Sequence, residues 1–149
     1  MKFSTREDID APVETVYQAV TDFDGFERQI LRRGIDLTRD ETRPPDVIGA
    51  RWNANFKWRG RPQDLEAELV SIEPNEGYAI ESRTGGIVCM GVVDLVSLSK
   101  ARTRMFVSLD LKPTTLSAKL LVQSLRLAKG SLSRRFKMRV ADFASDIGD

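Results

Sequence analysis

The chain contains no histidine among its 149 residues. Histidine is the commonest general base near neutral pH and the commonest zinc ligand. Its absence therefore excludes serine–histidine–aspartate triads, cysteine–histidine pairs and histidine-rich metal sites. Any chemistry would have to come from carboxylates, tyrosines, lysines, water or a cofactor.

Cysteine is nearly absent as well, since Cys89 is the only one. An internal disulfide and a cysteine-based metal cluster are both excluded, and neither a metal nor any other cofactor is predicted. No stretch approaches the roughly 18 apolar residues of a membrane-spanning helix. Residues 1–8 contain no apolar leader segment. These absences predict a cytoplasmic protein.

Internal repeats and low-complexity tracts are also missing. The composition is 41% hydrophobic and 30% charged, which is typical of an ordinary globular protein. A chain of this length is about one domain's worth and can bury most of its apolar surface. A single domain over residues 1–149 is therefore expected.

Two short helices are predicted near the start, after a strand over residues 2–9. Asp10 and Pro12 are typical of a helix beginning, with Asp10 as the capping side chain. Apolar side chains at helical spacing follow at Val13, Val16, Tyr17 and Val20. This pattern predicts a helix over 12–20, and similar spacing after residue 23 predicts a second helix that ends by Gly34.

From residue 35 the apolar period changes to two, which predicts strands joined by turns. The clearest strand spans 51–59, where apolar and polar side chains alternate. The other strands are expected over 35–39, 65–72, 78–83, 87–98 and 103–111. Hairpins in series predict an antiparallel sheet.

A long helix is predicted at the C-terminal end, because apolar residues recur every three or four positions from Leu121 to Ile147. It would span roughly 30 residues, which is long for a globular protein. Gly130 lies inside it, where glycine costs about 1 kcal/mol relative to alanine. A bend, or a close approach of the backbone to the sheet, is expected there.

Several segments resemble the START-like or Bet v 1-like superfamily (SRPBCC), and within it the bacterial polyketide cyclase/dehydrase group. They are residues 9–17 (IDAPVETVY), Asp22-Phe23 with Phe26, Gly49 with Trp52, Gly60, and residues 70–74 (VSIEP). The resemblance covers nearly the whole chain, although each motif is structural. It implies an α+β helix-grip fold, in which a curved seven-stranded antiparallel sheet wraps around the long C-terminal helix and encloses a cavity.

The resemblance further implies a ligand-binding site on the walls of that cavity. The predicted wall is mostly apolar and consists of Trp52, Phe56, Trp58, Leu69, Tyr78, Ile80, Val92, Asp94, Val107, Leu109, Leu125, Leu132 and Phe136. The same side chains could equally form a dry core, and the residues alone leave both readings open. Members of the superfamily bind lipids, hormones or polyketides, or act as modules without a ligand, so the resemblance names no ligand.

Asp94 interrupts an apolar run and shares a strand face with Val92 and Val96. If that face is the concave one, its carboxylate could act as an acid or anchor a ligand. The favoured alternative is an aspartate paired with Arg104 on the neighbouring strand, because unpaired buried charge is scarce. No catalytic constellation is recognised.

Seven basic residues and no acidic residue lie between positions 117 and 141. They are Lys119, Arg126, Lys129, Arg134, Arg135, Lys137 and Arg139. This helix could contact anionic surfaces transiently, or its charge could serve only as a solvated outer face. Nucleic acid is not an expected partner, because no binding motif accompanies the charge and the net charge is only +1. A homodimer is left open.

The sequence therefore favours a binding or carrier protein for a hydrophobic small molecule or lipid. One alternative is a cyclase or dehydrase acting on a polyketide-like substrate, which would have to use Asp94, Tyr78 or water. A protein-interaction module without a ligand is another. Whether the chain is an enzyme is left open, and the loop over 38–48 and the turn over 84–86 are expected to form the cavity rim.

Overall fold

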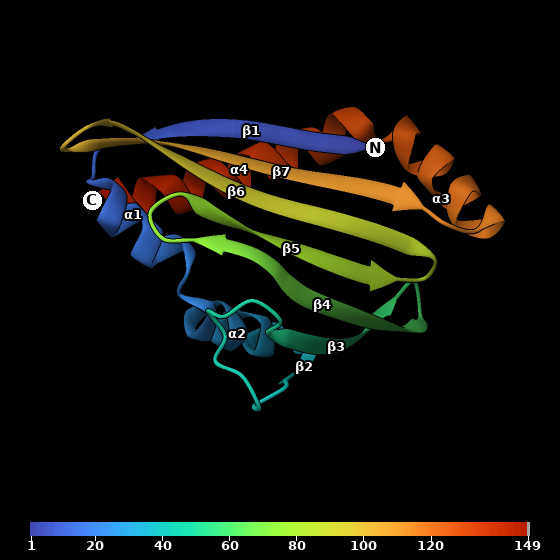
Figure 1. Cartoon of the computed structure of the whole chain (residues 1–149). Helices are drawn as coiled ribbons and strands as arrows, with labels where there is room; N and C mark the ends of the chain where they lie inside the picture. The colour runs from blue at the N-terminus through green and yellow to red at the C-terminus, as the bar shows by residue number, and fades with distance from the viewer. Residues whose placement is uncertain (149) are drawn as a thin grey trace.

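The computed structural model describes residues 1–148 of the chain. One sheet and four helices make up the fold (Figure 1). In chain order the elements are β1 (Lys2–Ile9), α1 (Val13–Val20), α2 (Phe23–Arg32), β2 (Asp36–Arg39), β3 (Arg51–Trp58), β4 (Arg61–Glu73), β5 (Gly77–Thr84), β6 (Ile87–Ser99), β7 (Arg102–Pro113), α3 (Leu116–Leu127) and α4 (Lys129–Gly148). The predicted order of the strands and the two short helices is confirmed.

The seven strands form one sheet in the order β1-β7-β6-β5-β4-β3-β2, and every neighbouring pair is antiparallel. From β2 to β7 each strand pairs with the next one along the chain, as the series of predicted hairpins requires. β1 returns to the far edge beside β7. The curved sheet with a long C-terminal helix across one face confirms the predicted helix-grip arrangement.

Alternating side chains give β3 one face toward the protein interior and one face toward solvent. Trp52 and Ala54 are buried, whereas Arg51 and Asn55 are exposed. Ala54 lies opposite Leu65 of β4, so the apolar positions of neighbouring strands meet on the same side. That side is the concave face of the sheet, and it faces the helices.

The two short helices begin differently from each other. α1 starts after Pro12, and no side chain caps it, so the prediction that Asp10 caps this helix is wrong. In α2 the Asp22 carboxylate accepts a hydrogen bond of 3.1 Å from the backbone N–H of Gly25. This bond satisfies one of the free N–H groups of the first turn and fixes where α2 begins.

The C-terminal helix is two helices rather than the single one predicted. α3 begins after Thr115, whose hydroxyl accepts from Ala118 N at 3.1 Å, and it ends at Ala128, where φ is −102° and ψ is 11°. The predicted bend therefore exists, two residues before Gly130. Gly130 makes no close approach to the sheet, because it is exposed and only the Arg134 side chain lies near it.

The tightly packed core lies where α1 and α4 meet the sheet. Its buried members are Ile9, Ala11, Val16, Val20, Leu95, Met105 and Ala144. A second buried cluster joins Phe23, Ala50, Trp52 and Leu69 beneath α2. Phe26 of α2 and Phe143 of α4 touch with ring centroids 5.8 Å apart, which links the two helices across the concave face. No helix within residues 1–148 is both long and apolar enough to cross a bilayer.

Candidate functional site

The concave face is not filled by side chains. α4 packs on β1 at one edge of the sheet, whereas α2 packs beside β2 at the other edge. Cavities remain between them. Three cavities lie along this space, and we name them after the helix that contributes to each one. None of the three is fully enclosed.

The α2 cavity has a volume of about 330 Å³ and an almost purely apolar lining. Its walls come from α2 and from the inner faces of strands β2 to β5. They are Phe23, Phe26, Glu27, Ile30, Ile35, Leu37, Trp52, Ala54, Phe56, Leu65, Ala67, Tyr78 and Ile80. Glu27 is the one charged side chain in this lining.

The α3 and α4 cavities continue the same space on either side. The α3 cavity, of about 390 Å³, is lined by Phe56, Trp58, Gln63, Thr84, Gly85, Ile87, Ser117, Ala118, Leu121 and Leu125. The α4 cavity, of about 300 Å³, is lined by Val20, Phe26, Tyr78, Val93, Met105, Val107, Phe136, Arg139, Val140 and Phe143. Phe56 is shared by the α2 and α3 cavities, and Phe26 and Tyr78 by the α2 and α4 cavities. The three cavities are therefore neighbours, separated by common walls, along the concave face.

Glu27 is held at the wall of the α2 cavity by two partners. The indole Nε1 of Trp52 donates to its Oε1 at 2.7 Å, and Nη1 of Arg39 lies 3.2 Å from the same oxygen. Arg39 also bonds to Asp24 at 3.1 Å. The second carboxylate oxygen of Glu27 forms no hydrogen bond within residues 1–148, and it can accept one from a ligand.

Tyr78 lies where the α2 and α4 cavities meet. Its ring packs edge-on against Phe23, with centroids 5.2 Å apart. Burial raises the pKa of the Tyr78 hydroxyl well above its ordinary value. The phenol is therefore neutral throughout the physiological range, and it has no hydrogen-bond partner in the part of the chain that the structure describes.

Polar atoms are sparse in the α3 cavity. The Thr84 hydroxyl is buried and has no hydrogen-bond partner within residues 1–148. Thr84 and Gln63 lie on the lining of this cavity. An unpaired hydroxyl out of water is unfavourable, so a ligand group that bonds to Thr84 would stabilise the protein.

The structure brings most of the predicted wall together. Trp52, Phe56, Trp58, Tyr78, Ile80, Val107, Leu125 and Phe136 each line at least one of the three cavities. Leu69 is fully buried in the cluster beneath α2 and forms core instead. Leu109 faces the concave side opposite Phe3, and like Leu132 it is outside the three linings. The turn over 84–86 borders the α3 cavity through Thr84 and Gly85.

Val92 and Asp94 are placed on the wrong face by the sequence analysis. Val93, between them, lies opposite Tyr78 and Val107 and faces inward, so Val92 and Asp94 point to the convex side. Asp94 is exposed. The alternative pairing with Arg104 is also wrong, because Arg104 forms two hydrogen bonds, of 2.7 and 3.1 Å, with Asp8 of β1.

No protein-family profile matches the sequence, and no curated protein is significantly similar to it. Solved structures do share its fold. TTHA0849 from Thermus thermophilus is 15% identical, covers 99% of this chain and 97% of its own, and has a TM-score of 0.64. Norcoclaurine synthase from Thalictrum flavum, in complex with a transition-state analogue, is 11% identical over 99% of this chain and 93% of its own, with a TM-score of 0.66. The Zhui aromatase/cyclase from Streptomyces sp. R1128 is 9% identical over 99% and 93%, with a TM-score of 0.65.

The chain has the START-like, or Bet v 1-like, fold. At these identities the likeness shows the fold alone, and the resemblance read from the sequence motifs is confirmed at that level. Enzymes are among the proteins with this fold, as the names norcoclaurine synthase and aromatase/cyclase state. The fold does not specify the function, which depends on the cavities of this chain.

Sequence analysis missed the contribution of α2 to the START-like cavity. Phe26, Glu27 and Ile30 all line the α2 cavity. Their spacing of one, three and four puts them on neighbouring positions of one helix face, which could have been recognised. No local pattern indicated that this face would lie over β3, because that depends on how α2 packs against β2.

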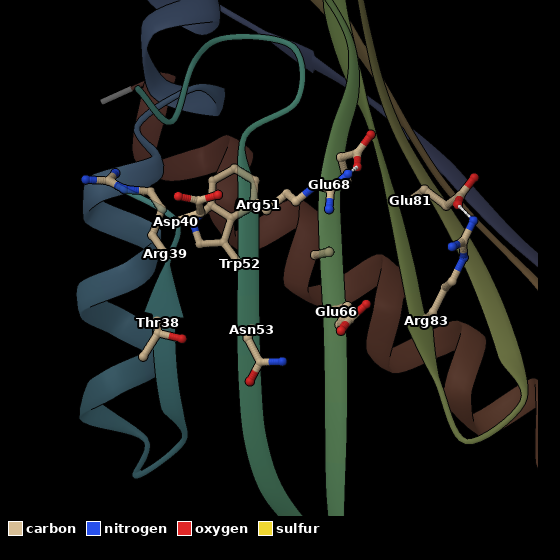
Figure 2. A pocket seen from close by; sticks show the side chains of 11 residues that line it. Thr38, Arg39, Asp40, Arg51, Trp52, Asn53, Glu66, Glu68, Glu81 and Arg83 are labelled. Carbon is tan, nitrogen blue, oxygen red and sulfur yellow. Dashed lines mark hydrogen bonds and ion pairs between the residues drawn. The ribbon is translucent and has the colours of Figure 1, made fainter. Parts of the chain in front are cut away.

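The convex face of the START-like sheet carries a groove of different character (Figure 2). It has a volume of about 420 Å³ and is lined mainly by polar side chains of β2 to β5. Arg51 points toward Glu68, with which it forms an ion pair of 2.9 Å, and Arg83 pairs with Glu81. Two of its cations therefore pair with carboxylates of the groove itself, whereas the third, Arg39, pairs with Asp24 and Glu27 outside it.

Proposed function

We propose that this protein binds a hydrophobic small molecule on the concave face of its sheet. The observation that carries the proposal is the row of three neighbouring apolar cavities, which share Phe56, Phe26 and Tyr78 as common walls. Apolar pockets with a few convergent polar groups are the usual form of a small-molecule site. Empty apolar space of this size lowers stability, and a ligand that occupies it restores the lost contacts.

The polar groups restrict the chemistry of the ligand. Glu27 presents a free carboxylate oxygen, Tyr78 a neutral hydroxyl, and the cation Arg39 is outside the lining of the α2 cavity. A carboxylate ligand in the α2 cavity would meet the like charge of Glu27, whose neighbouring cation Arg39 is already shared between Glu27 and Asp24. The fitting ligand therefore has an apolar body and a hydrogen-bond donor, such as a hydroxyl or an ammonium group.

A thermal-shift series tests both parts of the proposal. Three naphthalene derivatives with the same ring system would be compared: 2-naphthylmethanol, 2-naphthylmethylamine and 2-naphthoic acid. A ligand at 100 times its dissociation constant adds about 2.7 kcal/mol to stability, which raises the melting temperature by several degrees. The alcohol and the amine are expected to stabilise the protein, and the acid to bind about tenfold more weakly.

A matched pair of variants places the ligand. Ala67 lines the α2 cavity from β4, whereas Ala79 of β5 lies opposite Val92 and faces the convex side. Ala67→Leu is expected to abolish the shift, and Ala79→Leu to leave it unchanged. If neither the naphthalene series nor a broader set of lipids and aromatic polyketides stabilises the wild-type protein, the binding proposal fails.

An enzyme of the cyclase type is the alternative that the same site would permit. It would have to use Glu27 or Tyr78, because the chain has no histidine. Incubation with a bound ligand, followed by mass spectrometry, separates the two. An unchanged ligand mass and an unchanged chromatographic retention time support a binding protein, because a ring closure can conserve mass. A new product that Glu27→Gln abolishes would replace the proposal with an enzyme.

We further propose a location, an oligomeric state and a surface contact for this protein. A cytoplasmic location, a homodimer and a contact of the basic C-terminal region with anionic surfaces all belong here. The first is checked by fractionation of cells that express the protein, and the second by sedimentation equilibrium. For the contact with anionic surfaces, we propose a specific surface on α3 below.

A further inference from the structure

α3 has apolar residues on two opposite faces. Ala118 and Val122 are buried against the rest of the protein, and Leu121 and Leu125 line the α3 cavity. The other face carries leucines whose exposed fractions are far above those of ordinary core-forming residues. They are Leu116 at 75%, Leu120 at 58% and Leu127 at 93%.

These three leucines form one stripe. They are spaced by four and by seven residues, which puts them on the same side of a helix. We call Leu116, Leu120 and Leu127 the α3 leucine stripe. In Figure 1, α3 lies at the end of the sheet where β7 stops, away from α1 and α2. The high exposure of its three leucines leaves the stripe free to meet a large surface.

The surroundings of the stripe are basic. Lys119 and Arg126 lie on α3 beside it, and Lys112 and Lys129 stand in the chain just before and just after the helix. All four are exposed. The sequence contains no acidic residue between Asp110 and Asp142, so nothing along this segment neutralises the positive charge.

We propose that the α3 leucine stripe docks on the surface of an anionic lipid bilayer. An apolar face flanked by lysine and arginine is the pattern of a helix that lies in a membrane interface. The leucines would enter the boundary between headgroups and acyl chains, and the basic side chains would meet the anionic headgroups. A second copy of the chain is a poorer occupant, because a two-fold contact through this stripe would bring the basic groups of both copies together.

The orientation of α3 on the bilayer would affect the α3 cavity. The same helix that carries the stripe forms a wall of the α3 cavity through Leu121 and Leu125. Docking would therefore place this cavity next to the bilayer, where an apolar ligand could pass between them. This consequence rests on the proposed binding function, whereas the docking itself does not.

Vesicle binding tests the docking. The full-length protein is mixed with vesicles of phosphatidylcholine alone, or of phosphatidylcholine and phosphatidylserine in equal parts, and bound protein is measured by co-sedimentation. We expect binding to the anionic vesicles at low salt. The double variant Leu120→Ser/Leu127→Ser is expected to reduce the partition coefficient by at least about tenfold, because each leucine loses its apolar burial in the interface.

Two matched controls separate the effect of the stripe from that of other exposed apolar side chains and from that of net positive charge. Leu31→Ser/Met138→Ser removes apolar side chains that are 50% and 64% exposed on α2 and α4, and should leave vesicle binding unchanged. Lys119→Gln/Arg126→Gln should weaken binding several-fold at low salt, whereas Arg134→Gln/Arg135→Gln, with the same change in net charge, should weaken it less.

Three vesicle results would overturn the docking: no binding of the wild type to anionic vesicles, equal binding by the leucine variant, or equal loss in the Leu31/Met138 control. A stable dimer that Leu120→Ser/Leu127→Ser dissociates would also overturn it, in favour of a second copy. The naphthalene thermal shift should persist in the leucine variant, because neither leucine lines a cavity. If the wild type binds none of the ligands, the proposed function is refuted, but the docking proposal is not affected.

Discussion

Trp52 of β3 and Glu27 of α2 are joined by a hydrogen bond of 2.7 Å from the indole Nε1 to the carboxylate Oε1. The bond ties a helix to the inner face of the sheet across 25 positions of sequence. It also orients Glu27, the one charged group of the α2 cavity lining. Arg39 contacts the same carboxylate oxygen, so the other oxygen can accept a hydrogen bond from a ligand. The polarity of the proposed ligand site depends on this arrangement.

Glu27→Gln is expected to lower affinity for the amine ligand about tenfold and for the alcohol much less. A hydrogen bond to a charged acceptor contributes more than a neutral one, and only the amine also gains from the negative charge. Isothermal titration calorimetry measures both affinities. Asp24→Asn is the control, because Asp24 also contacts Arg39 but is outside the cavity lining. Equal losses in both variants would place the effect on Arg39 instead.

Tyr78→Phe is expected to change the free energy of unfolding at neutral pH by no more than about 0.5 kcal/mol. The hydroxyl lacks a partner among residues 1–148, so its removal breaks no hydrogen bond within the described structure. Tyr78→Ala should cost about 3–5 kcal/mol, because the ring packs against Phe23. Urea denaturation measures both, and a large loss in Tyr78→Phe would reveal a hydroxyl contact that the structure lacks.

Stability should fall in alkaline solution, and Tyr78 should contribute to the fall. Burial raises the pKa of Tyr78 in the folded state above its unfolded value. Its contribution is therefore complete below the unfolded pKa of about 10 and is lost as the pH rises toward the folded pKa. Tyr78→Phe should lose less stability than the wild type above pH ~10 in urea denaturation. Some loss should remain, since burial also raises the pKa of Tyr17.

Thr103→Val is expected to destabilise the protein by about 1–3 kcal/mol. Thr103 is fully buried, and its hydroxyl donates to the carbonyl oxygen of Ala11 at 2.8 Å, which fixes the chain between β1 and α1 against β7. Valine has a similar shape but leaves that carbonyl unpaired. Thermal unfolding checks the change, with the exposed Thr38→Val as a control that should stay within about 0.5 kcal/mol.

Two glycine-to-alanine variants should act in opposite directions. Gly130→Ala is expected to stabilise the protein by about 0.5–1 kcal/mol, because the residue is helical and exposed. Gly77→Ala should destabilise it by at least about 1–3 kcal/mol, since its φ is +135° and a Cβ there would overlap the carbonyl oxygen of Val93. Denaturation midpoints compare the two, and similar shifts would contradict this assignment of roles.

The patterns that the sequence determined are local ones. Alternation in β3 predicted which side chains share the inner face, and Trp52, Phe56 and Trp58 all line cavities. It did not predict that Trp58, near the end of the strand, is 40% exposed. Spacing of three and four predicted both short helices and the helical C-terminal region. Turn residues separated the strands, so the antiparallel order followed. Each of these signals lies within a few neighbouring positions, where backbone geometry fixes which side chains share a face.

Tertiary structure alone decided which face of β6 points inward and that Glu27 lies in the α2 cavity. Residues 87–98 are apolar on both sides, so no alternation marks the inner face, and only pairing of Val93 with Tyr78 and Val107 puts Val92 and Asp94 outside. Glu27 becomes a cavity residue because α2 folds over β3 and Trp52 reaches it. Such contacts join segments that are distant in the chain, and their geometry is set by packing of whole elements rather than by any local propensity.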